Sequence, residues 1–103
     1  MKIYELTRIK KKTYDVTIFQ TPEFNQRKGY QKVYRTDIEG NNHHECLENV
    51  FRQFNIVDCI PEDYDGRFIR TGDIIYIDEG RLGQYYYRLE PGGWNPINRI
   101  QVR

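Results

Sequence analysis

"GNNHHECLENVFRQFN", residues 40–55, is the stretch that decides the fold, because the spacing of apolar residues changes here from two to about 3.6. This period predicts one amphipathic helix over roughly residues 43–54. Asn42 can cap its N-terminus, and Glu45, three residues later, completes a capping-box pattern. The apolar residues of the stretch share one helical face: Cys46, Leu47, Val50, Phe51 and Phe54.

On both sides of this helix apolar and polar residues alternate, which is the period of a β-strand. In residues 12–20, Val16 and Ile18 fall on one face and Thr17 and Phe19 on the other. The same spacing, bounded by turn residues, predicts four further strands: 31–39, 74–78, 84–90 and a last one around 97–102.

The order strand, strand, helix, strand, strand, strand indicates an α+β fold in a single domain spanning residues 1–103. The simplest packing is a twisted, mainly antiparallel sheet of about five strands with the helix packed on one face. A small half-open barrel is the alternative. One helix cannot cover both faces of such a sheet, so the second face must meet water, a partner or residues 1–9, whose conformation the spacing leaves open.

The run of three tyrosines at 85–87 tests this arrangement, because neighbouring residues of a strand point to opposite faces. We expect Tyr85 and Tyr87 to lie under the helix with Phe51 and Phe54, and Tyr86 to point to the second face.

Composition limits the class of protein. The chain has 103 residues, of which 30% are charged and 38% apolar, as in globular domains. Residues 1–5 lack the apolar segment of a signal peptide, and no apolar run is long enough to span a membrane, so we expect a cytoplasmic protein. In that reducing compartment Cys46 and Cys59 should be free thiols.

Charge is segregated along the chain although the net charge is only +1. Residues 1–35 hold 9 Lys/Arg against 3 Asp/Glu, and residues 36–80 hold 3 against 11. The basic run "RIKKK" (8–12) is typical of a solvated strand entry, but Lys10, Lys11 and Lys12 could also contact an acidic protein surface or anionic lipid headgroups.

The aromatic residues near the C-terminus could form a binding surface. With a protein partner, we expect contacts from Tyr86, Arg88, Trp94 and Arg99. Together with Tyr76, the same residues could instead stack the bases of single-stranded nucleic acid. The acidic middle of the chain would repel phosphates, and the aromatic consensus of RNA-recognition domains is missing, so nucleic acid is the less favoured partner.

No pattern in the chain indicates an enzyme or a cofactor. Serine is absent from the sequence, and no glycine-rich phosphate loop opens the helix. His43 and His44 should be solvated residues of the first helical turn, and with Cys46 and Cys59 they show no recognised metal-ligand spacing. The carboxylates of "PEDYDG" (61–66) lack the ligand pattern of a calcium loop.

The string "IPEDYDGRFIRTGDIIYID" (60–78) resembles the signature of the YodL-like domain family. Three further segments extend the resemblance over nearly the whole chain: "YDVTIFQTPE" (14–23), "RKGYQKVYRT" (27–36) and "PGGWNPINRI" (91–100). The resemblance implies a non-enzymatic protein associated with the actin-like protein MreB and with control of cell shape. It transfers no catalytic residue. Related domains also occur in mobile-element proteins.

The residues that match the family motif are Pro61, Glu62, Asp63, Tyr64, Gly66, Arg67, Gly72 and Asp73. Turn chemistry explains most of them, so we interpret the motif as mainly structural. Pro61 suits the first position of a short helical turn, Tyr64 can tuck its ring beneath it, Gly66 permits a positive φ, and Gly72 with Asp73 sets the corner before a strand.

Overall fold

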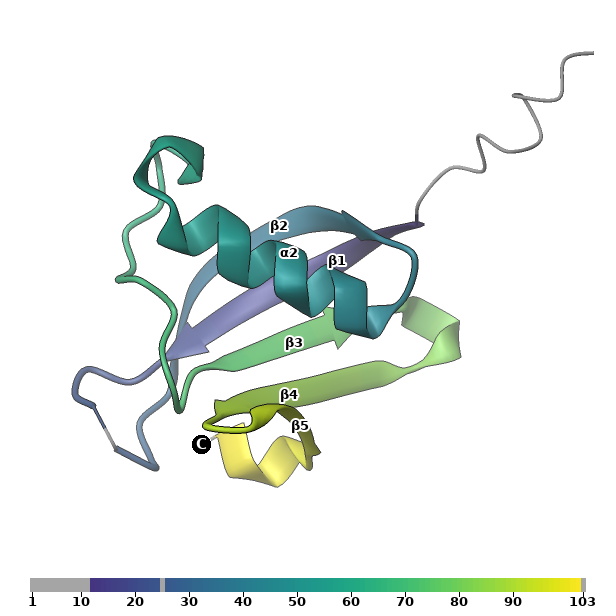
Figure 1. Ribbon diagram of the computed structural model, residues 1–103. Coiled ribbons are helices and arrows are strands. Elements are labelled where there is room, and N and C mark those ends of the chain that lie inside the picture. Colours follow the sequence, from purple (N-terminus) through teal and green to yellow (C-terminus); the bar gives the residue numbers. More distant parts are fainter. Residues whose placement is uncertain (1–11, 25, 103) are drawn as a thin grey trace, which may run out of the picture.

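Five antiparallel strands form one sheet, with one α-helix across it, in residues 12–24 and 26–102, which the computed structural model describes (Figure 1). The order across the sheet is β2-β1-β3-β4-β5. The elements span Lys12–Gln20 (β1), Gln31–Gly40 (β2), His43–Asn55 (α2), Ile74–Asp78 (β3), Gln84–Glu90 (β4) and Gly93–Ile97 (β5). The predicted α+β fold is confirmed. Because β2 and β5 lie at opposite ends of this order, the sheet is open and not a barrel.

The helix begins as the sequence predicts. The Asn42 side chain accepts from the Glu45 N–H at 2.8 Å, and the Glu45 carboxylate accepts from the Asn41 N–H at 2.9 Å. The turn before the helix is tight, since a Cβ at Gly40 would lie 2.8 Å from the Cys46 backbone nitrogen.

The core lies between α2 and the face of the sheet that carries Val16 and Ile18, both fully buried. Cys46, Leu47 and Val50 contribute from the helix, as expected. Phe51 was expected there too, but it is 41% exposed. Phe51 lies at the edge of the apolar face of the helix. The centre of that face is formed by residues spaced three and four apart, which contact the sheet.

The last strand is earlier than predicted. β5 is Gly93–Ile97, and Arg99–Val102, expected to be strand, forms a 3-10 turn labelled η3. Only a two-residue turn separates β4 from β5, since Glu90 pairs with Gly93. Gly93 has a φ of 128°. Pro96 is tolerated because β5 is an edge strand.

Pro61 does not begin a helical turn. A 3-10 turn at Val57–Cys59 (η1) precedes it, and Ile60 is extended, as residues before proline usually are. Pro61 instead occupies the first position of a β-turn, in which the Tyr64 N–H donates to its carbonyl at 3.1 Å.

Within the described residues, no helix is long and apolar enough to cross a membrane. The segment 1–9, whose conformation the sequence left open, lies outside the described residues.

Candidate functional site: the second face of the sheet

The strand register arranges side chains in three rows on the second face of the sheet, the face opposite α2. The acidic row contains Asp37, Asp15, Asp78 and Gln84. The aromatic row contains Arg35, Thr17, Tyr76, Tyr86 and Ile97. The third row contains Lys32, Phe19, Ile74, Arg88 and Asn95. The second face therefore changes from acidic to aromatic to partly basic along the strand direction.

Tyr76 and Tyr86 form the centre of the aromatic row. Their rings stack with centroids 4.6 Å apart and planes 27° from parallel, and both side chains are half-buried. Burial raises the pKa of Tyr76, and the nearby Asp78 charge raises it further. The pair lines a shallow groove of about 560 Å³ that also includes Ile97 and Arg99. Each ring therefore lines the groove and is also packed against the other ring.

The acidic row places Asp15 between two other aspartates, with Asp37 opposite it on β2 and Asp78 on β3. Like charges at directly opposed positions destabilise a sheet. Arg35 relieves part of this repulsion, since its Nε and Nη2 donate to the two Asp15 oxygens at 2.9 and 2.6 Å. The Gly80 N–H, together with Gln84, holds the pKa of Asp78 below its usual value. Asp78 therefore stays ionised at neutral pH.

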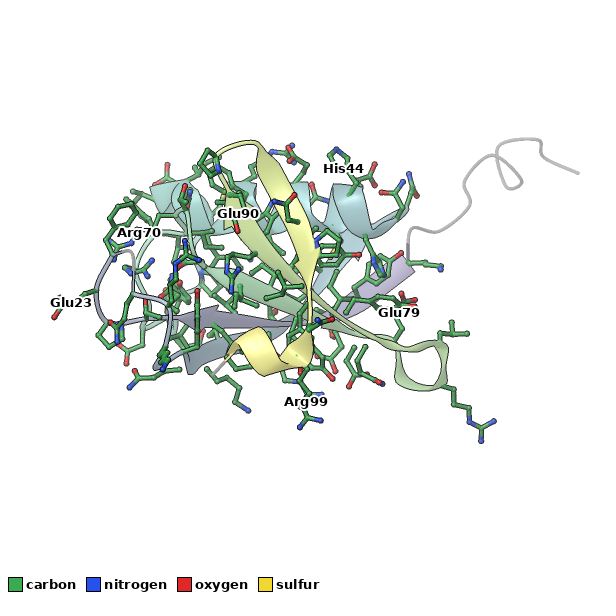
Figure 2. All side chains as sticks on the ribbon, turned by 90° about the horizontal axis from the view of Figure 1, so that it is seen from below. Glu23, His44, Arg70, Glu79, Glu90 and Arg99 are labelled. Carbon is green, nitrogen blue, oxygen red and sulfur yellow. The ribbon has the colours of Figure 1, made fainter. Side chains whose placement is uncertain are left out.

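The structure brings together only some of the residues predicted to bind a partner. Tyr86 and Arg99 line the same groove, and Figure 2 shows Arg99 on the C-terminal turn η3. Arg88 lies in the third row, with its Nη1 3.7 Å from Glu90. Trp94 pairs with Leu89 and packs against the core, so it lies on the helix face. Tyr86 and Trp94 therefore lie on opposite faces of the sheet and cannot belong to one continuous binding surface.

The basic run of residues 8–12 is described only at its end. Lys12 begins β1 with an exposed side chain, 5.8 Å from the centre of the Tyr14 ring. Lys10 and Lys11 lie outside the described residues.

A cluster around His43 was missed by the sequence analysis, which expected a solvated side chain. His43 Nδ1 lies 2.6 Å from the Tyr87 hydroxyl and Nε2 lies 2.5 Å from Glu79 Oε2. The rings of Tyr14, Tyr85 and Tyr87 meet its imidazole edge-on, with centroids 5.3, 4.6 and 5.6 Å away. Burial is the main cause that raises the pKa of Tyr87. These contacts connect the start of α2 to the β3–β4 hairpin. Figure 2 shows Glu79 in that hairpin.

The expected positions of Tyr85 and Tyr87 are therefore partly correct. Both lie on the helix face, but they contact His43 at the start of the helix. Phe54, near the helix end, packs on Tyr34 and Tyr64. The alternation along the strand predicted which face of the sheet the two tyrosines lie on. Their contacts depend on the register between strands, which the alternation does not give.

The thiols differ in environment. Cys46 is fully buried, and burial together with the Glu79 charge raises its pKa from 9.0 to about 12, which makes it a poor nucleophile. Cys59 is exposed, and both are free. In the part of the chain that the structure describes, no group of three or more His, Cys, Asp or Glu side chains could hold a metal ion.

The family motif centres on a buried carboxylate, Asp73, which is 1% exposed. Arg67 donates to its two oxygens through Nη1 and Nη2, both at 2.8 Å, and Gln20 Nε2 donates to Oδ2 at 3.0 Å. The Tyr64 hydroxyl donates to the Arg67 carbonyl at 2.6 Å. These contacts join β1 to the segment before β3, which is a scaffold role.

Other motif residues also make contacts within the fold. Asp63 accepts from the Tyr34 hydroxyl at 2.6 Å, and the Gly72 carbonyl accepts from Tyr30 at 2.5 Å. Glu62 is exposed. Gly66 does not have the positive φ expected of it. A Cβ there would lie 2.5 Å from the Tyr64 hydroxyl oxygen, so close packing is what requires glycine.

The fold and the second face define a small α+β protein that presents an aromatic and charged sheet surface. The chain belongs to the YodL-like domain family, whose family model matches residues 1–97. It is 54% identical over 100 residues to the Bacillus subtilis (strain 168) protein named "Uncharacterized protein YodL", which covers 95% of this chain and 96% of that protein. No solved structure matches the chain.

Proposed function

We propose that this protein is a non-enzymatic, cytoplasmic protein-interaction domain that binds and inhibits an actin-like filament protein such as MreB through the second face of its sheet. The choice of partner is supported by the resemblance to YodL-like domains, which implies an association with MreB and with cell shape. The geometry of the second face supports the choice of binding surface. The stacked pair of Tyr76 and Tyr86 is the observation that carries the proposal.

Two features of the pair suit an interface between proteins. Tyrosine offers a large apolar surface and a polar end while losing little side-chain entropy, so it is frequent among the residues that dominate binding energy. Tyr86 is also held by its neighbour, which lowers the entropy lost when a partner fixes it. The groove beside the pair would accept an apolar side chain of the partner.

The charged rows give the interface an orientation. Asp15 and Asp37 lie on one side of the aromatic row, and Lys32 and Arg88 lie on the other. A partner surface with the complementary order of charges would be attracted in one orientation and repelled in the reverse one. This predicts an association rate that falls as salt concentration rises.

Single-stranded nucleic acid is the second candidate, and Tyr86 beside Arg99 is the observation that favours it. The acidic row lies next to these rings, however, and Trp94 lies on the opposite face of the sheet. Anisotropy of a labelled mixed-sequence oligonucleotide at low salt tests this candidate. A rise on titration would support it, because the phosphate contribution is strongest at low salt.

Co-sedimentation with polymerised MreB tests the main proposal, together with a pull-down from bacillus lysate using the tagged protein. We expect the protein to pellet with the filaments, or to shift MreB into the supernatant if it prevents polymerisation. If neither occurs and MreB is missing from the pull-down, the proposed partner is wrong.

A further inference from the structure

The two edges of the sheet differ in their ability to accept another strand. β5 is a five-residue strand that contains Pro96, which has no N–H to donate. β2 is ten residues long and contains no proline. A bulge leaves Val33 unpaired where the register shifts, so the regular part of this edge runs from residue 34 toward Gly40.

One side-chain contact shows which backbone groups of β2 point away from the sheet. Asn49 of the helix donates to the Glu39 carbonyl at 2.8 Å, so this carbonyl points away from β1. In an antiparallel ladder, alternate residues direct both N–H and C=O to the same side. The backbone groups of Asp37 and Arg35 therefore also point outward. The Glu39 carbonyl already accepts a hydrogen bond from the helix. Residues 35–37 are therefore the part of this edge that could pair with another strand.

The charges on this edge are complementary to those of a second copy of the same strand. If two β2 strands pair antiparallel about a two-fold axis at Thr36, Arg35 of each copy lies opposite Asp37 of the other, on the same face of the joined sheet. Shifting the axis to Arg35 or to Asp37 would place like charges opposite each other. Only the register centred on Thr36 pairs both charges.

Both side chains are placed to make this contact. Arg35 is 64% exposed even though it binds Asp15, and its guanidinium has further N–H donors. Asp37 is exposed and lies opposite Asp15 within its own sheet, so a cation from a second copy would relieve the repulsion between them.

We propose that the protein forms a homodimer by antiparallel pairing of β2 with β2 of a second copy, in the register that places Arg35 opposite Asp37. The two sheets then form one continuous sheet. Their second faces lie side by side, so a partner that repeats along a filament would meet two binding faces at once. The dimer itself does not depend on the function proposed above, because it is measured without any partner.

Two charge reversals test the register. Arg35→Glu gives an edge with two acidic residues, and Asp37→Lys gives one with two basic residues, so neither variant can pair with itself. In an equimolar mixture, each acidic residue of one chain lies opposite a basic residue of the other. Analytical ultracentrifugation should show a concentration-dependent dimer for wild type, monomers for each variant alone, and a dimer in the mixture.

Asp37→Pro provides a test that does not depend on charge. The N–H that it removes points away from β1, so the β1–β2 ladder stays complete while the outer edge is blocked. We expect this variant to be a monomer with the wild-type far-ultraviolet circular dichroism spectrum. A wild-type protein that is monomeric throughout the concentration series overturns the proposal. So does a mixture of the two charge variants, each folded by circular dichroism, that stays monomeric.

Discussion

Tyr76 and Tyr86 lie directly opposite each other on β3 and β4, and their rings stack 4.6 Å apart on the face of the sheet opposite α2. Tyr87, the next residue, points to the helix face and packs against the core. Adjacent tyrosines thus have different structural roles, which can be separated by substitution.

We predict that Tyr87→Ala lowers the free energy of unfolding by about 3 kcal/mol, because it truncates an aromatic ring packed on the core. Tyr86→Ala should lower it by less than about 1 kcal/mol, since its ring is only half-buried and lies on the face opposite the helix. Urea unfolding of both variants measures the difference. Equal losses would mean that both faces of β4 are buried to the same degree.

The contacts of His43 predict that the hydroxyl of Tyr87 contributes to the stability of the fold. Tyr87→Phe leaves His43 Nδ1 without its partner in a side chain that is only 21% exposed, and should cost about 1–2 kcal/mol. Tyr85→Phe is the matched control, because the Tyr85 hydroxyl donates to the Leu82 carbonyl in an exposed position. It should cost no more than about 0.5 kcal/mol. Thermal melts that rank the two variants in the reverse order would contradict the assigned role of His43.

Gly66 and Gly92 form another matched pair. Gly66→Ala would place a methyl group 2.5 Å from the Tyr64 hydroxyl oxygen, whereas a Cβ at Gly92 would have no atom within 4 Å. We expect Gly66→Ala to cost about 1–3 kcal/mol and Gly92→Ala to change stability little, as measured by urea unfolding. A neutral Gly66→Ala would show that Tyr64 can move aside without cost.

Burial of Cys46 predicts a loss of stability at alkaline pH. Its pKa is raised from 9.0 to about 12, so the folded state retains a proton that the unfolded state releases within this window. This stabilisation is complete below the lower value and declines as pH rises, by up to about 1.4 kcal/mol per pH unit. Urea unfolding across the window should show a shallower decline for Cys46→Ala. Tyr64, whose pKa is raised to about 12 mainly by burial, accounts for part of the remaining slope. Parallel slopes for the two proteins would contradict this account.

The sequence predicted those parts of the fold that depend on local periodicity. Alternation along residues 12–20 correctly separates Val16 and Ile18 from Thr17 and Phe19, and the capping pattern at Asn42 correctly places the helix start. These features depend on residues within one turn or one strand, so a single sequence contains the necessary information.

What the sequence could not predict depends on register between strands. His43 meets Glu79 and Tyr87, which are 36 and 44 residues away, only because β3 and β4 pair as they do. Trp94 shows how sensitive the site is to one residue. The turn between β4 and β5 is two residues long, which places Trp94 opposite Leu89 and on the helix face. Shifting that register by one residue would move its ring to the other face of the sheet.

The central claim is that the second face, through Tyr86, binds an actin-like filament protein. Co-sedimentation with polymerised MreB should compare wild type, Tyr86→Ala and the neighbouring control Tyr85→Ala, whose ring lies on the helix face and is 37% exposed. We predict that Tyr86→Ala lowers affinity at least about tenfold, as loss of a binding hot spot does, and that Tyr85→Ala binds like wild type. If the Tyr86→Ala protein is folded and binds like wild type, or if Tyr85→Ala alone loses binding, the second face is not the interface.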